Sequence, residues 1–142
     1  MTSYRLRLGA LAVVAWAGPS AALANVEGVW LDKDGCAMRI QACGDAMCGT
    51  ISGLKPREDP ATGRPWTDKK NADPGLRSRP LVGVPVLISM RPSGPRKWSG
   101  RLYNADNGKT YSGNLIELGP QTIRVEGCVL GICGGESLTR MR

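Results

Sequence analysis

The stretch from Trp98 to Leu118, WSGRLYNADNGKTYSGNLIEL, carries the clearest fold signal in the chain. Two runs of strand-forming residues, Trp98–Asn104 and Lys109–Leu118, flank the tripeptide Asp106-Asn107-Gly108. Asn-Gly between two such runs favours a tight turn, because both residues tolerate the positive φ angles that hairpin turns require. The stretch therefore predicts a β-hairpin.

Apolar and polar residues alternate with a period of two on both sides of this hairpin. Met38 and Ile40, for example, alternate with Arg39 and Gln41, as a half-buried strand requires. Gly, Pro and Asp-Gly turns separate the runs, and no segment shows the helical period. We expect eight strands, at about residues 26–32, 36–41, 47–54, 81–90, 98–104, 109–118, 123–126 and 136–142.

Eight short strands joined by hairpin-length turns predict an all-β fold, an eight-stranded antiparallel meander closed into a barrel. A barrel of this size either fills its interior with side chains or holds one small ligand. A β-sandwich is the alternative, since the number of strands does not separate the two architectures. Pro85 within the fourth strand requires an edge position or a bulge.

One long loop, about residues 55–80, interrupts the strands. It contains five prolines and no periodic apolar face. Loops of this length are usually functional or disordered. We expect either an ordered cover over one barrel end, held by Trp66 and Leu76, or a segment that gates a ligand or binds a partner. The carboxylates and amide within residues 68–73 match a calcium loop only loosely, and capping of turns explains them.

The N-terminal segment has the three parts of a secretory signal peptide. Arg5 and Arg7 form the positive start, Leu8–Ala17 is an apolar run, and Ala22-Leu23-Ala24 is a small-residue cleavage site. A membrane anchor is the alternative, but spanning a bilayer takes ~20 apolar residues. We expect cleavage after Ala24, a signal peptide of residues 1–24, a mature domain of residues 25–142, a periplasmic location and no membrane span.

All five cysteines lie in the mature domain, and four form two pairs with equal spacing. Cys43 and Cys48, and likewise Cys128 and Cys133, enclose four residues that include a Gly. In an oxidising compartment this spacing favours two local disulfides. A four-cysteine zinc site and the other pairings remain alternatives. Cys36 is left over, as a buried thiol, a reactive thiol or an intermolecular partner.

The composition excludes several functions. The 142 residues include 19 Lys plus Arg and 12 Asp plus Glu, which gives a net charge of +7, and no His. Without His the chain alone cannot build a Ser-His-Asp triad or a His-ligated metal site. Aromatic residues make up 5%, which is few for the stacking platforms of nucleic-acid binders. We expect a protein that is not an enzyme, with no cofactor, no metal and no nucleic-acid partner; its basic surplus is solvated surface or, alternatively, a polyanion- or membrane-surface patch.

Two short motifs at the ends of the mature domain resemble the barrel closure of the lipocalin superfamily. They are Gly28-Val29-Trp30 on the first expected strand and Thr139-Arg140 on the last. In that superfamily, the Trp of a Gly-x-Trp motif packs under an Arg from the end of the chain, ring face against guanidinium. The resemblance implies that Trp30 and Arg140 close the barrel.

Further motifs are similar to those of an exported, lipocalin-like bacterial family, the domain-of-unknown-function family DUF2147. They span nearly the whole mature domain and include Ile40–Cys43, Met47–Gly49, Asp59–Gly63, Leu76–Gly83, Trp98–Asn104, Gly108–Tyr111 and Arg124–Gly127. The family typically ends in Gln-Thr-Trp-Thr-Arg, and this chain departs from that pattern at Leu138. The resemblance implies a lipocalin-like barrel in the cell envelope and brings no established reaction or catalytic residue.

We therefore expect an exported barrel that binds an apolar or amphipathic small ligand, such as a lipid or fatty acid. Arg79 or Arg101 would meet a charged head group. The candidate lining residues, with Trp66 at the mouth, are Met38, Ile40, Leu102 or Tyr103, Tyr111 and Leu115. The same side chains could simply fill the barrel as its core. The alternative function is a non-catalytic structural or interaction protein of the cell envelope that uses the 55–80 loop.

Overall fold

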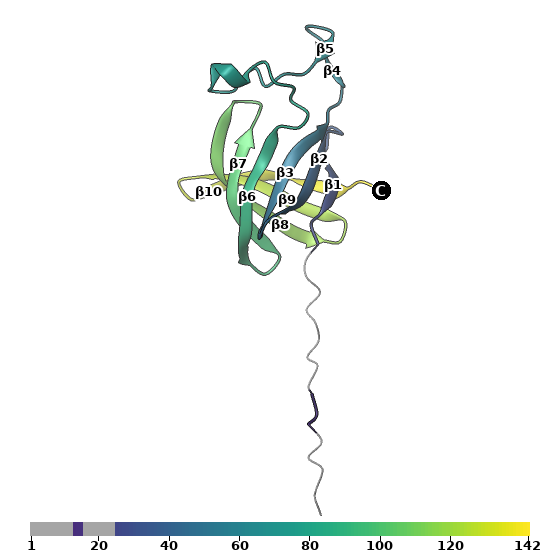
Figure 1. The fold of residues 1–142 in the computed structure, drawn as a ribbon, viewed down its shortest axis with the longest axis vertical. Coiled ribbons are helices and arrows are strands. Elements are labelled where there is room, and N and C mark those ends of the chain that lie inside the picture. The colour runs from purple at the N-terminus through teal and green to yellow at the C-terminus, as the bar shows by residue number, and fades with distance from the viewer. Residues whose placement is uncertain (1–12, 16–24) are drawn as a thin grey trace, which may run out of the picture.

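The computed structural model of the protein describes residues 13–15 and 25–142. Eight of its strands form one closed antiparallel barrel, as Figure 1 shows. These strands are β1 (Gly28–Leu31), β2 (Ala37–Cys43), β3 (Ala46–Gly53), β6 (Pro85–Gly94), β7 (Lys97–Asn104), β8 (Lys109–Gly119), β9 (Thr122–Val129) and β10 (Ile132–Arg140). Their spatial order is β1-β10-β9-β8-β7-β6-β3-β2, and β1 also pairs with β2. The predicted barrel is confirmed, and the sandwich alternative is wrong.

The expected hairpin is formed by β7 and β8, which pair along the whole of β7 from Lys97↔Ile116 to Asn104↔Lys109. Gly108 closes the turn with a φ of 71°, and its backbone N–H donates to the Asn104 carbonyl at 2.8 Å. The strand ends differ elsewhere. β6 starts at Pro85 rather than residue 81, because Leu81 donates its N–H to the Trp66 carbonyl in the loop. The expected irregularity at Pro85 is present, since the β3–β6 register shifts beside its partner Thr50.

The segment between β3 and β6 contains more regular structure than the sequence suggested. It includes a two-stranded sheet, β4 (Glu58–Asp59) with β5 (Arg64–Pro65), and the 3₁₀ turn η1 (Pro74–Leu76). Figure 1 shows these elements beyond the end of the barrel where β3 stops and β6 begins. Leu76 is exposed and does not anchor the loop, whereas the indole N–H of Trp66 donates to the Pro56 carbonyl.

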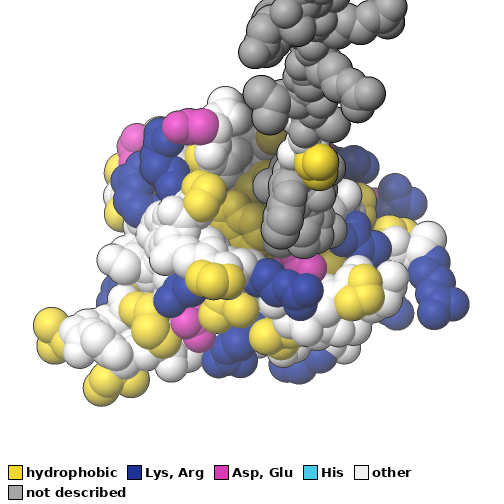
Figure 2. Space-filling view, turned by 90° about the horizontal axis from the view of Figure 1, so that it is seen from below, with side chains coloured by type: hydrophobic (Ala, Val, Ile, Leu, Met, Phe, Trp, Pro, Cys, Tyr) yellow, Lys and Arg dark blue, Asp and Glu magenta, His cyan; other side chains and the backbone are white. Residues whose placement is uncertain are grey.

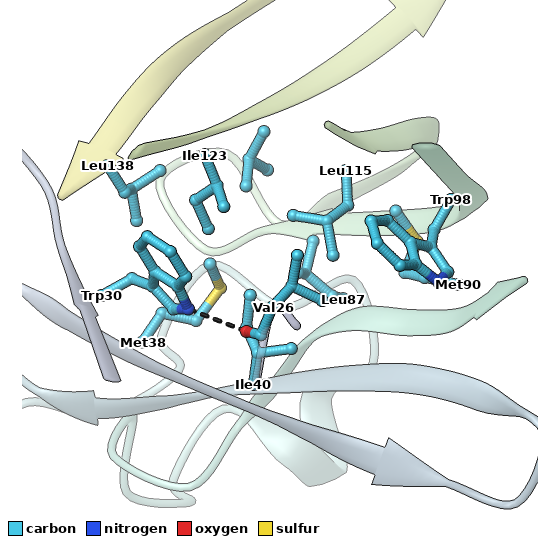
Figure 3. Packing of buried hydrophobic residues seen from close by; sticks show 11 residues of the cluster. Val26, Trp30, Met38, Ile40, Leu87, Met90, Trp98, Leu115, Ile123 and Leu138 are labelled. Carbon is cyan, nitrogen blue, oxygen red and sulfur yellow. Dashed lines mark hydrogen bonds between the residues drawn. The ribbon is translucent and has the colours of Figure 1, made fainter. Parts of the chain in front are cut away.

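Side chains on the inward faces of the strands form one apolar core. Figure 3 shows it as a cluster in which Trp30, Leu87 and Leu115 are fully buried. The indole N–H of Trp30 donates to the Val26 carbonyl at 2.9 Å, which satisfies the ring's polar atom inside the core. The other members are Val26, Met38, Ile40, Met90, Trp98, Ile123, Val125 and Leu138.

One end of the barrel, which we call the sealed end, is closed by Arg140. Its guanidinium carbon lies 4.3 Å from the centroid of the Trp30 ring, so the pairing implied by the family resemblance is present. The same group donates to the backbone carbonyls of Asn25, Glu27 and Pro120 at 2.7 to 3.0 Å. A Cβ on Gly28 would lie 2.8 Å from a guanidinium nitrogen, which explains the absence of a side chain there.

Both predicted disulfides are present, Cys43–Cys48 and Cys128–Cys133. They clip the β2–β3 and β9–β10 hairpins, and they occupy the sulfurs that a four-cysteine zinc site would need. Cys36 is the remaining free cysteine. Disulfides persist in oxidising compartments, so the two bonds are consistent with an extracytoplasmic protein. Apart from residues 13–15, the expected signal peptide lies outside the described residues.

No helix within residues 13–15 and 25–142 is long and apolar enough to cross a bilayer. Figure 2 looks toward the sealed end and shows Lys and Arg side chains spread over this face with few carboxylates between them. The basic residues on this face are therefore dispersed rather than gathered into one patch.

Candidate ligand cavity

The end of the barrel opposite Arg140, which we call the mouth, holds a cavity of about 320 Å³. Its floor is the upper surface of the core, formed by Met38, Val125 and Leu138, which are 8%, 8% and 5% exposed. The rest of the lining is Asp32, Asp34, Cys36, Ala37, Ile51, Leu54, Leu81, Val86, Leu102, Ala105, Asp106 and Glu136. Core packing thus stops partway along the barrel and leaves apolar surface facing an open space.

The alternation of side chains along each strand explains why these residues meet. Met38 is in the core, so Cys36, two positions earlier and just before β2, faces inward. In the same way Leu138 and Glu136 share the inward face of β10. At the mouth, therefore, a thiol and a carboxylate occupy positions that hold apolar side chains deeper in the barrel.

The rim of the cavity is acidic. Four carboxylates line the cavity, those of Asp32, Asp34, Asp106 and Glu136, and no Lys or Arg does. One carboxylate oxygen of Asp32 accepts the backbone N–H groups of Asp34 and Cys36 at 2.8 and 2.9 Å, which holds the β1–β2 turn in place. This turn and the β7–β8 turn therefore present carboxylates on opposite sides of the opening.

Glu136 and Glu126 show how differently the two faces of the barrel wall treat a carboxylate. Partial loss of hydration, followed by the negative charge of Asp32, raises the pKa of Glu136, and Lys33 only partly opposes this. Glu126 lies on the outer face of β9, where a hydrogen bond from Asn114 and the neighbouring Arg124 lower its pKa. The mouth disfavours negative charge, whereas the outer wall accommodates it.

The loop between β3 and β6 is anchored beside the mouth by one buried carboxylate. Asp68 is 1% exposed and accepts hydrogen bonds from Tyr103 Oη at 2.6 Å, Asn71 Nδ2 at 2.9 Å and Arg79 Nε at 2.9 Å. Burial acts to raise the pKa of Asp68, but these hydrogen bonds and the Arg79 charge outweigh it and lower the pKa. Burial, followed by the hydrogen bond to Asp68, raises the pKa of Tyr103.

The loop also packs closely on the β7–β8 turn. A Cβ on Gly108 would lie 1.7 Å from the Lys70 carbonyl oxygen, so the backbone of the loop rests directly on this glycine. Tyr103 follows the inward-facing Leu102 and therefore lies on the outer face of β7. The loop is thus fixed against the outside of the barrel wall, and Leu81, which follows it, reaches the cavity.

The structure does not gather the side chains that the sequence suggested as ligand contacts, although Leu102, the alternative to Tyr103, lines the cavity. Met38 lies in the cavity floor, and Ile40 and Leu115 lie within the core. Trp66, Arg79 and Tyr103 belong to the loop and its anchor. Arg101 is exposed, and Tyr111 accepts a hydrogen bond from Asn107.

Sequence reasoning missed the acidic rim and the place of Cys36. One signal was available for Glu136: it lies two positions before Leu138 on an alternating strand, so both share a face. Asp106 was assigned only to the turn of the hairpin. Its approach to the cavity depends on the curvature of the closed barrel, which the sequence pattern does not specify.

Comparisons with known proteins agree with this architecture. A solved structure from Helicobacter pylori, described as a protein of that human pathogen belonging to the lipocalin family, is 18% identical, with a TM-score of 0.69. The match covers 83% of this chain and 84% of that chain, and at this identity it shows a shared fold. A search of curated proteins gave no match.

The family comparison covers the whole barrel. The model of the family described as "Uncharacterized protein conserved in bacteria (DUF2147)" matches residues 28–140, from the first residue of β1 to the last residue of β10. The match includes both disulfides, the Trp30–Arg140 contact and every residue of the cavity lining. The chain therefore belongs to the DUF2147 family.

Proposed function

We propose that this protein binds one small, largely apolar molecule in the mouth cavity. The observation that carries the proposal is the incomplete core: apolar packing ends at Met38, Val125 and Leu138, and open space lies above them. The volume of about 320 Å³ falls within the ~300–1,000 Å³ typical of ligand pockets, at the lower end. A short-chain lipid or another small amphiphile suits this space better than a long acyl chain.

We also propose that the chain is exported to the periplasm and that its signal peptide is cleaved after Ala24. The tripartite sequence of residues 1–24 supports this proposal, and so do the two disulfides. Intact-mass measurement of protein recovered from the periplasm tests it. A mature chain starting at Asn25 is expected, and a chain that keeps Met1 or remains in the cytoplasm contradicts it.

Cys36 provides a built-in test of ligand binding. It is the one free thiol among the described residues and it lines the cavity. An apolar ligand such as decanol should slow alkylation of Cys36, because an occupied cavity shields the thiol. The rate is followed by mass spectrometry under non-reducing conditions.

A matched variant separates shielding from any general effect of decanol on the reagent. Cys36→Ser combined with Ser93→Cys moves the thiol to an exposed position near the sealed end of β6. Decanol should leave the alkylation rate of this variant unchanged. Unslowed alkylation of Cys36 at saturating decanol in the parent protein would overturn the proposed function.

The second candidate, an interaction protein of the cell envelope, is favoured by one observation. The tip of the β9–β10 hairpin exposes Val129, Leu130 and Ile132, with Leu130 98% exposed, and Cys128–Cys133 clips its base. Exposed apolar groups on a rigid hairpin are typical of contact surfaces. Failure of Cys36 protection, together with loss of a cross-linked envelope partner in Leu130→Ser, would favour this function over ligand binding.

A further inference from the structure

We propose that the mouth cavity selects molecules with an apolar tail and a cationic head group, such as alkylamines or alkylammonium ions. The proposal rests on the proposed function and specifies its ligand class. Apolar side chains form the floor, Glu136 faces inward above them, and Asp32 and Asp106 lie at the rim. A bound amphiphile would place its tail on the floor and its head among these carboxylates.

The acidic rim stands out because the chain as a whole is basic. Its net charge is +7, with only 12 Asp plus Glu, and four of these line one small cavity. Figure 2 shows the opposite balance toward the sealed end, where Lys and Arg side chains predominate. The negative charge is therefore concentrated at the opening of the apolar space, where it would attract and orient a cation.

Most of this negative charge is not neutralised by the protein. Glu136, Asp32 and Asp106 form no ion pair with a residue in the described part of the chain. Asp34 pairs with Lys33 at 2.8 Å, and both side chains are exposed, so this pair is weakened by solvent. Two carboxylates elsewhere on the barrel do have basic partners, Asp45 with Arg91 and Glu126 with Arg124.

Glu136 also indicates how the cavity would treat an anionic ligand. Its pKa is raised because its carboxyl loses hydration beside other carboxylates. A fatty acid head group placed there would experience the same loss of hydration and the same repulsion. The arginines that the sequence offered for a carboxylate are elsewhere: Arg79 is paired with Asp68, and Arg101 does not line the cavity. The geometry therefore favours a cation over the fatty acid first expected.

Three probes with the same tail test this preference: decylamine, decanol and decanoate, at neutral pH, low ionic strength and concentrations below micelle formation. Binding is measured by calorimetry and by protection of Cys36. We expect decylamine to bind about tenfold more tightly than decanol, and decanoate to bind most weakly. The advantage of the amine should shrink as salt is added, because the rim charges are solvent-accessible.

Substitution of the rim identifies the groups responsible. In the double variant Glu136→Gln with Asp106→Asn, decylamine should lose most of its advantage, whereas decanol affinity should stay the same. The matched control is Asp45→Asn with Glu58→Gln, which removes two exposed carboxylates that do not line the cavity. This control should keep the preference for the amine.

The outcomes separate this inference from the proposed function. Equal affinity for decylamine and decanol, or tighter binding of decanoate, overturns the cation preference and leaves the binding function intact. Loss of the preference in the control variant shows that overall charge produces it, which also overturns the inference. Failure of every probe to bind overturns the proposed function itself.

Discussion

The same eight strands build the sealed end and the mouth of this barrel, but they place different side chains on their inward faces. At the sealed end the inward positions hold large apolar groups such as Trp30 and Trp98, and Arg140 covers the opening. At the mouth they hold smaller or polar groups such as Cys36 and Glu136, and the interior stays open. The comparison shows that tight apolar packing and open apolar space are divided along the barrel axis rather than between separate elements.

The largest expected difference concerns two leucines truncated at opposite ends. Leu115→Ala removes a fully buried core side chain, and we expect it to lower the free energy of unfolding by about 3 kcal/mol. Leu81→Ala affects a half-buried side chain at the cavity wall, and the expected loss is about 1 kcal/mol or less. Urea denaturation measures both. Equal losses would mean that the mouth is packed as tightly as the sealed end.

Substitutions in the anchor of the long loop are expected to have the second-largest effect on stability. Asp68→Ala should lower the free energy of unfolding by about 2 kcal/mol, because it leaves the buried hydroxyl of Tyr103 and the charge of Arg79 without their acceptor. Tyr103→Phe removes the hydrogen bond donated to Asp68 and the one accepted from Asn71, and it should cost about 1 to 2 kcal/mol. Chemical denaturation with limited proteolysis of residues 55–80 checks both values. A loop that stays protected in Asp68→Ala would contradict its role as the anchor.

Acid should weaken the same anchor. The folded pKa of Asp68 lies below its unfolded value near 3.8, so the carboxylate stabilises the fold fully above that value. This contribution is lost as the pH falls through the lower folded pKa. We therefore expect the stability difference between the parent protein and Asp68→Asn to narrow between about pH 5 and pH 2. Denaturation series at several pH values provide the measurement, and a constant difference would contradict the linkage.

Arg140 tests whether the sealed end depends on its cover. Arg140→Ala should cost about 1–2 kcal/mol, because it removes a cation–π contact with the buried Trp30 ring and leaves three backbone carbonyls without their donor. Arg140→Lys keeps the charge but cannot reach all three carbonyls, so its loss should be smaller but measurable. Thermal unfolding reports both variants. An unchanged melting temperature in Arg140→Ala would mean that the contact with Trp30 does not stabilise the barrel.

The smallest expected effect is a gain in the free energy of unfolding rather than a loss. Because the folded pKa of Glu136 is raised, its ionised form slightly destabilises the folded protein at neutral pH. Glu136→Gln should therefore stabilise by at most a few tenths of a kcal/mol, since solvent screens this exposed side chain. Precise denaturation at pH 7 compares it with Asp45→Asn, which removes a carboxylate with a lowered pKa and should not stabilise. A clear loss of stability in Glu136→Gln would show that the mouth is not a region where charge opposes folding.

Local sequence patterns were sufficient to predict much of the fold. The positive φ of Gly108 closes its hairpin turn, and equal spacing marks Cys43–Cys48 and Cys128–Cys133 as local disulfides. Each of these features depends on residues that are close in the chain. The Trp30–Arg140 contact is distant in sequence, and it was expected only through a resemblance to a family.

The candidate site was harder to predict because it depends on where strands end in three dimensions. Cys36, Asp106 and Glu136 belong to different hairpins and meet only when the barrel closes. Asp68 is buried because Tyr103, 35 positions away, lies under the loop. Aspartates usually lie on the protein surface, so the sequence alone predicts that Asp68 is exposed. No local pattern indicates that Tyr103 is its hydrogen-bond partner.

The contact between the two ends of the barrel sheet also constrains how the chain folds. Arg140 bonds to the carbonyl of Glu27, 113 positions earlier, and β1 pairs with β10 through only two residue pairs. The remaining barrel pairings join β1 to β2, β2 to β3 and β3 to β6, or link consecutive strands from β6 to β10, so they can form progressively as the chain emerges. Closure instead requires β10. The chain entropy lost on joining β1 to β10 is offset only when the contacts between these two strands form. The arrival of β10 therefore sets the earliest moment at which the barrel can close and its cavity can exist.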